Sequence, residues 1–179
     1  MATPLETLPG AIPAVHGSAA QVNAQSAGAT LLLKIASSRM WIVDIDGTVA
    51  LKTARHWYDW ARVEEDVPHV PVVTVVQALA AAGKQIVFAT GRMEQCRAAT
   101  VRWLHSNICT PEGTAVCHSP LYMRPDDDYR PDEVLKLEIY RTHIEPVGPV
   151  EGVLDDRNVV VAMWRDLGLT VLQCALGDF

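Results

Sequence analysis

Short apolar runs alternate with segments of helical periodicity along most of this chain, and this alternation constrains its fold most strongly. Each run is short enough for a strand and apolar enough to be buried on both faces. The runs predicted as strands are residues 40–43, 85–89, 115–117, 150–154 and 169–174. The segments predicted as helices are residues 72–79, 92–106, 131–144 and 160–167. Such alternation predicts an α/β fold, a Rossmann-like three-layer sandwich with a central parallel sheet.

Polar side chains stand where several of these predicted strands end. They are Asp44, Asp46, Thr90, Asp155 and Asp156. Ligands bind outside the carboxyl ends of the strands in open α/β sheets. These residues come from distant parts of the chain, so we expect the fold to gather them at one edge of the sheet.

The composition is that of one folded domain with an acidic balance. The chain has 179 residues, of which 49% are hydrophobic and 20% charged, and its formal net charge is -6. A domain of about this size needs no disulfide scaffold or structural metal. No apolar run approaches the roughly 20 residues that span a bilayer, so no membrane association is expected. The acidic charge argues against a protein that grips long nucleic acids.

Residues 1–38 differ from the rest of the chain. They are rich in Ala, Gly, Ser, Pro and Gln, and they carry almost no charge. No basic segment precedes the short apolar run Leu31-Leu32-Leu33, which does not resemble the core of a signal peptide. We therefore expect a loosely ordered N-terminal arm over residues 1–38 and a folded domain over residues 39–179.

The four cysteines, Cys96, Cys109, Cys117 and Cys174, form no Cys-x-x-Cys pair, and the six histidines show no metal-binding spacing. A structural zinc site is therefore not expected. We interpret all four as free thiols that pack as small apolar side chains. Free thiols suit the reducing cytoplasm, so a cytoplasmic location is expected.

The strongest local motif is Asp44-Ile45-Asp46-Gly47-Thr48, directly after the first predicted strand. An acidic turn is one interpretation, because Asp and Gly favour turns. A calcium loop is disfavoured, because that pattern requires a third acidic position and no preceding buried strand. The functional interpretation is a carboxylate nucleophile followed by a second carboxylate for acid–base chemistry.

In these residues the chain resembles the haloacid dehalogenase superfamily of phosphotransferases. The likeness runs from about residue 40 to residue 179: Asp44 to Thr48 resembles the first motif, Thr90 the second, Lys136 the third and Asp155-Asp156 the fourth. The second Asp of the first motif argues against the dehalogenase branch. Within the superfamily, three segments are similar to the 3′-phosphatase domain of bacteriophage-type polynucleotide kinase–phosphatase. They are residues 55–59, residues 130–144 and residues 154–179.

The resemblance implies a catalytic Mg²⁺ ion. It assigns the ion to Asp44, the backbone carbonyl of Asp46 and the pair Asp155-Asp156. Within the pair we favour Asp156 as the direct ligand. Asp155 would then contact the ion's ligands or reach the ion through a water molecule. Such an ion would offset the charge that makes a phosphate dianion repel an attacking carboxylate.

The resemblance also implies the catalytic roles. Asp44 would attack phosphorus to form an aspartyl-phosphate, and Asp46 would serve as general acid and then general base. Thr90 and the amide of Gly91 would hold phosphoryl oxygens at the start of a helix. Lys136 would neutralise developing charge, and Asp132 would orient it from one helical turn away, although the two residues taken alone would be read as an ordinary surface ion pair.

Three arginines are candidate clamps for the substrate phosphate: Arg55, Arg92 and Arg124. Arg55 follows the first motif, Arg92 follows Thr90-Gly91, and Arg124 matches by its distance from Lys136. Arginine suits bidentate contacts with phosphate oxygens. The alternative for each is a solvated surface arginine.

Residues 49–68 are expected to form a small flap over the site. This segment carries four aromatic side chains, His56, Trp57, Tyr58 and Trp60. They could stack on a nucleobase, or they could pack the flap onto the core, and the sequence does not separate these alternatives.

The function implied is that of a Mg²⁺-dependent phosphomonoesterase that removes a terminal phosphate, first of all a 3′-phosphate, from a nucleic-acid end. The chain contains no Gly-x-x-x-x-Gly-Lys-Ser/Thr motif, so no kinase half is expected. One alternative is a phosphatase of free nucleotides or another small phosphoester. A more distant one is a non-catalytic binding or assembly subunit. Homo-oligomerisation is an open possibility.

Overall fold

The computed structural model of this chain describes residues 39–56, 58–109 and 115–177. The predicted arm over residues 1–38 lies outside the described residues, and so do Trp57 and the last two residues of the family-like C-terminus. The segment Ser38–Phe179 forms one compact unit.

A five-stranded parallel sheet forms the centre of the fold. Its strands are β1 (Met40–Val43), β4 (Gln85–Met93), β5 (Leu121–Arg124), β6 (Val150–Arg157) and β7 (Val171–Gly177). Their order is β5-β4-β1-β6-β7, with every neighbouring pair parallel. Because the strand order reverses on either side of β1, the carboxyl end of β1 lies at the topological switch point, where α/β sheets bind ligands.

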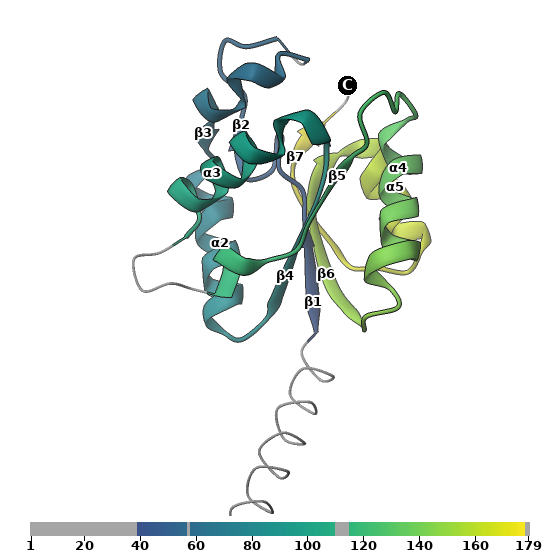
Figure 1. The fold of residues 1–179 in the computed structure, drawn as a ribbon. Coiled ribbons are helices and arrows are strands. Elements are labelled where there is room, and N and C mark those ends of the chain that lie inside the picture. The colour runs from purple at the N-terminus through teal and green to yellow at the C-terminus, as the bar shows by residue number, and fades with distance from the viewer. Residues whose placement is uncertain (1–38, 57, 110–114, 178–179) are drawn as a thin grey trace, which may run out of the picture. The chain divides into compact units, whose positions relative to one another are not determined.

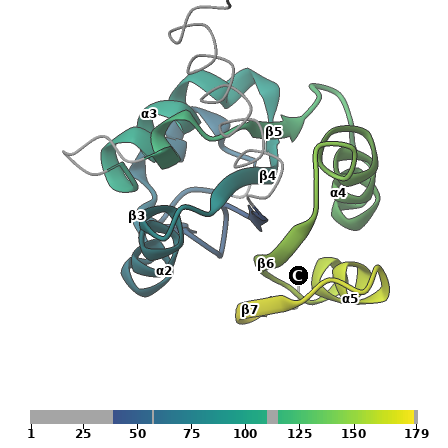
Figure 2. The ribbon, with the colours of Figure 1, turned by 90° about the horizontal axis from the view of Figure 1, so that it is seen from below.

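Helices cover both faces of the sheet (Figures 1 and 2). One face carries α2 (Val70–Ala81) and α3 (Arg97–Asn107), and the other carries α4 (Asp132–Ile139) and α5 (Asn158–Asp166). The predicted three-layer α/β sandwich is therefore confirmed. None of the described helices combines the length and the apolar character needed to cross a membrane.

Alternation along the strands divides the core into two apolar clusters. Val43 and Phe88 pack into the cluster on the α2–α3 side, while Ile42 and Val87 pack into the cluster on the α4–α5 side. Successive side chains of a strand point to opposite faces, so neighbouring residues of one strand pack into different layers. Burial on both faces explains why the strands are short, continuous apolar runs.

The segment between β1 and α2 forms the expected flap. Strands β2 (Ala50–Leu51) and β3 (Val67–Pro68) pair antiparallel, and the 3₁₀ segment η1 (Trp60–Glu65) lies between them. Trp103 of α3 donates a hydrogen bond of 2.7 Å from Nε1 to the carbonyl oxygen of Asp66. This buried bond fastens the base of the flap to the α3 layer.

Two predicted elements are wrong in place or type. Residues Ala115–His118 form a 3₁₀ segment, η3, and the edge strand β5 follows it. A run of three apolar residues does not distinguish a strand from a buried turn. The helix expected directly after Thr90-Gly91-Arg92 is also wrong, because β4 continues to Met93, the short 3₁₀ segment η2 (Glu94–Cys96) follows and α3 begins at Arg97. Pairing of Met93 with Arg124 of β5 extends the strand past the expected turn.

The prediction of four free thiols is wrong for Cys109 and Cys117. They form a disulfide, with their Cα atoms 5.4 Å apart. Ile108 and Val116, which adjoin these cysteines, are both buried in the same apolar cluster, so packing brings the ends of this loop together. Cys96 and Cys174 are free thiols, as predicted.

Candidate active site

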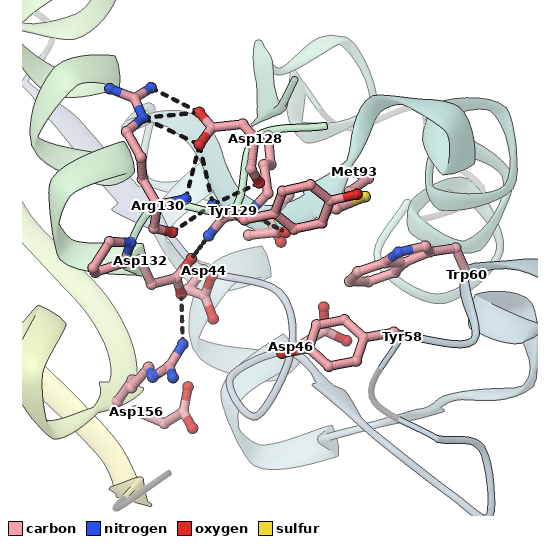
Figure 3. A pocket seen from close by; sticks show the side chains of 15 residues that line it. Asp44, Asp46, Tyr58, Trp60, Met93, Asp128, Tyr129, Arg130, Asp132 and Asp156 are labelled. Atoms are coloured by element: carbon pink, nitrogen blue, oxygen red, sulfur yellow. Dashed lines mark hydrogen bonds and ion pairs between the residues drawn. The ribbon is translucent and has the colours of Figure 1, made fainter. Parts of the chain in front are cut away.

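A cavity of about 620 Å³ opens at the carboxyl edge of the sheet (Figure 3). Residues predicted from the sequence line it, including Asp44, Asp46, Thr90, Gly91 and Asp156. They come from the ends of β1, β4 and β6 and from the loop after β1. The fold thus gathers at one edge the polar residues that end separate strands.

Lys136 joins two carboxylates beneath the cavity. Its Nζ donates to Oδ1 of Asp44 at 2.7 Å and to Oδ2 of Asp155 at 3.0 Å, and the lysine is almost wholly buried. Lys136 projects from the middle of α4, so a single helical position delivers the cation to strands β1 and β6. Burial would lower the pKa of Lys136, but Asp155, Asp44 and Asp132 together raise it above the ordinary lysine value. The ammonium therefore stays charged.

Three buried carboxylates crowd around this lysine. Ligand oxygens of Asp44, Asp155 and Asp156 all lie within 4.8 Å of one another. Burial raises the pKa of Asp44 well above its usual value, and the charges of Asp155 and Asp156 raise it further against the opposing effect of Lys136. One ammonium does not balance three carboxylates, so the cluster has the charge and the oxygen donors that suit a divalent cation.

Asp155 and Asp156 differ in what already contacts them. Asp155 accepts hydrogen bonds at Oδ2 from Lys136 and, at 3.2 Å, from Trp164 Nε1, and at Oδ1 from the backbone N–H of Arg157. Asp156 accepts at Oδ1 from the hydroxyl of Thr48 at 3.1 Å and lines the cavity. The carboxylate of Asp156 is therefore the one of this pair that faces the cavity.

Asp46 is held by two arginines. Arg92 donates to its two carboxylate oxygens at 2.8 Å each, and Arg55 donates to Oδ1 at 2.8 Å. Both guanidinium groups, which were predicted as phosphate clamps, thus contact carboxylates in this structure. Asp46 keeps 22% of its side chain exposed and lines the cavity.

Asp66 completes this network, and the sequence analysis did not identify it. Its oxygens accept from Nε and Nη2 of Arg55 at 2.8 and 2.7 Å and from Nη2 of Arg92 at 2.7 Å. The side chain of Asp66 is fully buried, whereas the neighbouring Glu64 and Glu65 are exposed. No local signal separates these three acidic residues, because only the folded flap brings Asp66 to the arginines.

Arg124 joins the end of β5 to the cavity. Its guanidinium donates to the carbonyl oxygens of Gly91, Asp128 and Arg130 and, at 2.7 Å, to Oδ1 of Asp132. Arg124 lines the cavity, but these contacts engage all three of its nitrogens. The structure thus shows Arg124 holding the loop between β5 and α4.

Asp132 lies among three cations. Besides Arg124, Arg157 Nη1 is 3.3 Å from its Oδ2 and Lys136 Nζ is 4.0 Å away. Burial would raise the pKa of Asp132, but Lys136, Arg124 and Arg157 hold it below its ordinary value. Contact between Asp132 and Lys136 agrees with the expected i,i+4 pair, although Lys136 is buried and Asp132 belongs to a larger network at the cavity.

Thr90 lies within strand β4 and is fully buried. Its hydroxyl oxygen accepts a 3.2 Å hydrogen bond from the backbone N–H of Arg92. The expected helix N-terminus at this position is therefore absent, since α3 begins only at Arg97. Any anion binding by Thr90 and Gly91 would rest on the side chain and the strand-end amides, and not on a helix dipole.

Two of the flap aromatics reach the cavity. Tyr58 and Trp60 line it, with their ring centroids 6.2 Å apart in an edge-on arrangement. Trp60 also packs against the small buried cluster of Val63, Cys96 and Met123, whereas Tyr58 is mostly exposed. His56 contacts Tyr58 with a centroid separation of 5.9 Å. Trp60 therefore packs the flap onto the core, while Tyr58 and Trp60 both face the cavity where a ligand would bind.

Comparison with known proteins places this geometry in context. Residues 38–179 match the family model described as the polynucleotide kinase PNKP phosphatase domain. A protein of Autographa californica nuclear polyhedrosis virus, named as a proposed bifunctional polynucleotide kinase/RNA ligase, is 38% identical over 143 residues. The matched region is 79% of this chain and 20% of the viral protein, so the chain spans about a fifth of the length of that curated relative.

Two solved structures share the fold. One, described as the Pnkp1/Rnl/Hen1 RNA repair complex, superposes with a TM-score of 0.72 at 33% identity, covering 79% of this chain and 44% of that chain. The other, of a Pnkp1/Rnl/Hen1 complex, gives a TM-score of 0.71 at 32% identity, covering 80% and 48%. Each likeness covers about four fifths of this chain, and the family model matches residues 38–179.

Proposed function

Because this chain belongs to the family of polynucleotide kinase PNKP phosphatase domains, phosphoric monoester hydrolases of the haloacid dehalogenase type, we propose that it removes a terminal phosphate from nucleic-acid ends. A 3′-phosphate is the proposed first substrate. One of the similar structures is described as an RNA repair complex, so RNA ends belong among the substrates to be tested.

One arrangement carries this proposal: the carboxylate of Asp44 stands at the cavity floor between the buried Lys136 and the carboxylates of Asp155 and Asp156. A nucleophile for phosphorus needs an accessible carboxylate whose orientation is fixed. It also needs positive charge nearby, since a phosphate dianion repels a carboxylate. Lys136 supplies one such charge and holds the nucleophile in place.

Mg²⁺ is the proposed cofactor, and the residues fit it. Mg²⁺ prefers oxygen ligands, and the carboxylates of Asp44 and Asp156 with the backbone carbonyl of Asp46 would provide them. Asp155 would not bind the ion directly, because Lys136, Trp164 and a backbone N–H already contact its oxygens. When bound, the ion supplies positive charge for the phosphoryl oxygens.

In the proposed reaction, an oxygen of Asp44 forms a bond to phosphorus while the bond from phosphorus to the terminal ribose oxygen breaks. Asp46 donates its proton to the leaving alkoxide, so a free hydroxyl end departs. Asp46 then takes a proton from a water molecule, which attacks phosphorus and releases inorganic phosphate from Asp44. The two arginines would hold Asp46 at the cavity while it carries and loses this proton.

Thr90 and Gly91 would contact the phosphoryl oxygens from the end of β4, and Lys136 would stabilise charge that develops on the phosphoryl group. Arg55, Arg92 and Arg124 would act mainly through the carboxylates and carbonyls they hold. A homo-oligomeric state and a cytoplasmic location stay predictions. The cytoplasmic location was expected from four free thiols, and only Cys96 and Cys174 of these are free, since Cys109 and Cys117 form a disulfide.

The test is phosphate release, with and without Mg²⁺, from oligonucleotides bearing a 3′- or a 5′-phosphate and from mononucleotides. We expect release from the 3′-phosphorylated oligonucleotides, and Asp44→Asn should abolish it. Asp166→Asn, an exposed change at the end of α5, is the matched control. Release from mononucleotides alone would establish the free-nucleotide alternative, and no release from any ester would favour a binding subunit.

A further inference from the structure

We propose that Tyr129, together with Tyr58 and Trp60 on the opposite wall, clamps the nucleobase of the nucleotide whose phosphate is removed. The inference rests on the proposed function and specifies how the same cavity recognises its substrate. Tyr129 belongs to the loop between β5 and α4, whereas Tyr58 and Trp60 belong to the flap. All three side chains line the cavity.

The cavity separates polar and apolar groups in a way that suits a nucleotide. Its floor carries the carboxylates of Asp44, Asp46 and Asp156, where the phosphate would react. Figure 3 shows Tyr129 pointing into the cavity from one side, with Tyr58 and Trp60 pointing in from the other. With the phosphate at the floor, the alcohol part of the ester would extend between these rings. A nucleobase offers two flat faces to such rings.

Exposure of the two tyrosines supports a ligand role. Tyr58 is 72% exposed and Tyr129 is 78% exposed, so neither ring is used to build the core. Trp60 is half-buried and packs against Val63 and Met123, which gives the flap side of the clamp a fixed base. Large aromatic surface left in solvent at the mouth of a cavity is typical of a binding site.

The loop under Tyr129 is held firmly although the ring itself is exposed. Arg124 Nη1 donates to the carbonyl oxygens of Asp128 and Arg130, at 3.2 and 2.8 Å, on either side of Tyr129. The carboxylate of Asp128 accepts from the backbone N–H of Arg130 at 3.0 Å. The exposed ring is thus presented by an ordered loop, which lowers the entropic cost of ligand binding.

The clamp predicts recognition of a base without strong preference among bases. Stacking uses the π-face that every nucleobase has, and the two charged neighbours of Tyr129 in the cavity lining, Asp128 and Arg130, hydrogen-bond to each other at 2.7 Å. The same chemistry occurs in a free nucleoside phosphate and in a strand end. Both kinds of substrate should therefore depend on the rings, and contacts beyond the terminal nucleotide would distinguish them.

The decisive experiment compares two 3′-phosphorylated oligonucleotides that differ only at the last residue. One ends in an ordinary nucleotide, and the other in a tetrahydrofuran abasic residue. The wild-type protein should favour the intact end in kcat/KM by roughly tenfold or more. Tyr129→Ala and Tyr58→Ala should each reduce this preference toward one, mainly through KM. Tyr129→Phe keeps the ring and should keep the preference.

A second readout does not depend on turnover. Asp44→Asn should bind an oligonucleotide ending in 2-aminopurine 3′-phosphate and quench its fluorescence by stacking, and adding Tyr129→Ala should remove most of the quenching. If Tyr129→Ala lowered kcat/KM equally on the intact and the abasic end, or left the quenching unchanged, the clamp would be disproved. A wild-type protein that quenches 2-aminopurine but releases no phosphate would refute the proposed reaction and support the clamp. A nucleoside 3′-phosphate tested alongside shows whether the strand adds affinity.

Discussion

Asp66 and Arg92 form a wholly buried ion pair, with Oδ2 of the carboxylate 2.7 Å from Nη2 of the guanidinium. Arg92 extends the same Nη2 to Asp46 at 2.8 Å. A residue of the flap thereby fixes the arginine that holds the proposed acid–base carboxylate, so the position of the flap and the placement of Asp46 are coupled through one side chain.

We expect Asp66→Asn to destabilise the protein by on the order of 3 kcal/mol and to lower kcat by more than the loss of folded protein explains. The change leaves two buried guanidinium groups short of a partner, and removing one member of a buried pair is costly. Thermal unfolding followed by circular dichroism, together with phosphate release from a 3′-phosphorylated oligonucleotide, measures both effects.

Glu65→Gln is the matched control, because Glu65 precedes Asp66 and pairs with Arg62 at the exposed surface. Such pairs contribute about 0 to 1 kcal/mol. If Asp66→Asn behaved like Glu65→Gln in both assays, the coupling between the flap and Asp46 would be disproved.

The sequence pattern predicted the position of those site residues that lie at strand ends. Asp44 and Asp156 were placed correctly at the cavity because each follows or ends an apolar strand, and parallel strands end at one edge. The partners of Arg55, Arg92 and Arg124 were not predictable in this way. Residue type indicates that an arginine suits phosphate, but carboxylates and carbonyls attract it for the same reason.

The errors in secondary structure have the same origin. Strand β4 continues through Thr90 to Met93 because β5 pairs with its end, a contact between residues far apart in sequence. The apolar run at Val116 packs into the core as a 3₁₀ turn, since burial alone does not require an extended backbone. Tertiary contacts therefore decided both cases where the local pattern was ambiguous.

Divalent metal should stabilise the folded protein through the three-carboxylate cluster. At a free Mg²⁺ concentration about 100 times Kd, the gain is about 2.7 kcal/mol, which is several degrees in Tm. Asp156→Asn should abolish this rise. Without metal, the same variant should be at least as stable as the wild type, because burial and the charge of Asp155 disfavour the Asp156 carboxylate and raise its pKa. Thermal unfolding over a Mg²⁺ titration measures both the metal-dependent rise in Tm and the stability of the variant without metal.

Asp166→Asn, which changes an exposed acid at the end of α5, controls for loss of charge alone and should keep the full metal response. An unchanged Mg²⁺-dependent rise in Tm for Asp156→Asn would place the cation elsewhere.

The cations around Asp132 make its contribution to stability depend on pH. Lys136, Arg124 and Arg157 lower its pKa in the folded state against the effect of burial. A lowered folded pKa contributes stability that is complete above the ordinary Asp value of about 4 and is lost as the pH falls through the lowered value. Asp132→Asn should therefore cost on the order of 3 kcal/mol at neutral pH, and the difference should shrink below about pH 4.

Urea unfolding of the wild type and of Asp132→Asn, each measured from about pH 7 down to about pH 3, gives this difference directly. A stability difference that stayed constant with pH, or grew as the pH fell, would contradict the charge argument. The loss in Asp132→Asn would then come from altered packing and not from the lost charge.

Gly91 is required by the close approach of Asp132. A Cβ at position 91 would lie 2.5 Å from Oδ1 of Asp132, the same oxygen that Arg124 Nη2 contacts at 2.7 Å. Gly91→Ala should therefore push Asp132 away from Arg124, cost about 1–3 kcal/mol and reduce kcat/KM by roughly tenfold or more. Gly148→Ala is the matched control, since the nearest atom there is Met40 Cε at 3.9 Å, an ordinary contact. Because both changes act on one contact, Gly91→Ala combined with Asp132→Ala should lose less than the sum of the single effects, and strict additivity in unfolding and kinetics would show that the glycine acts by another route.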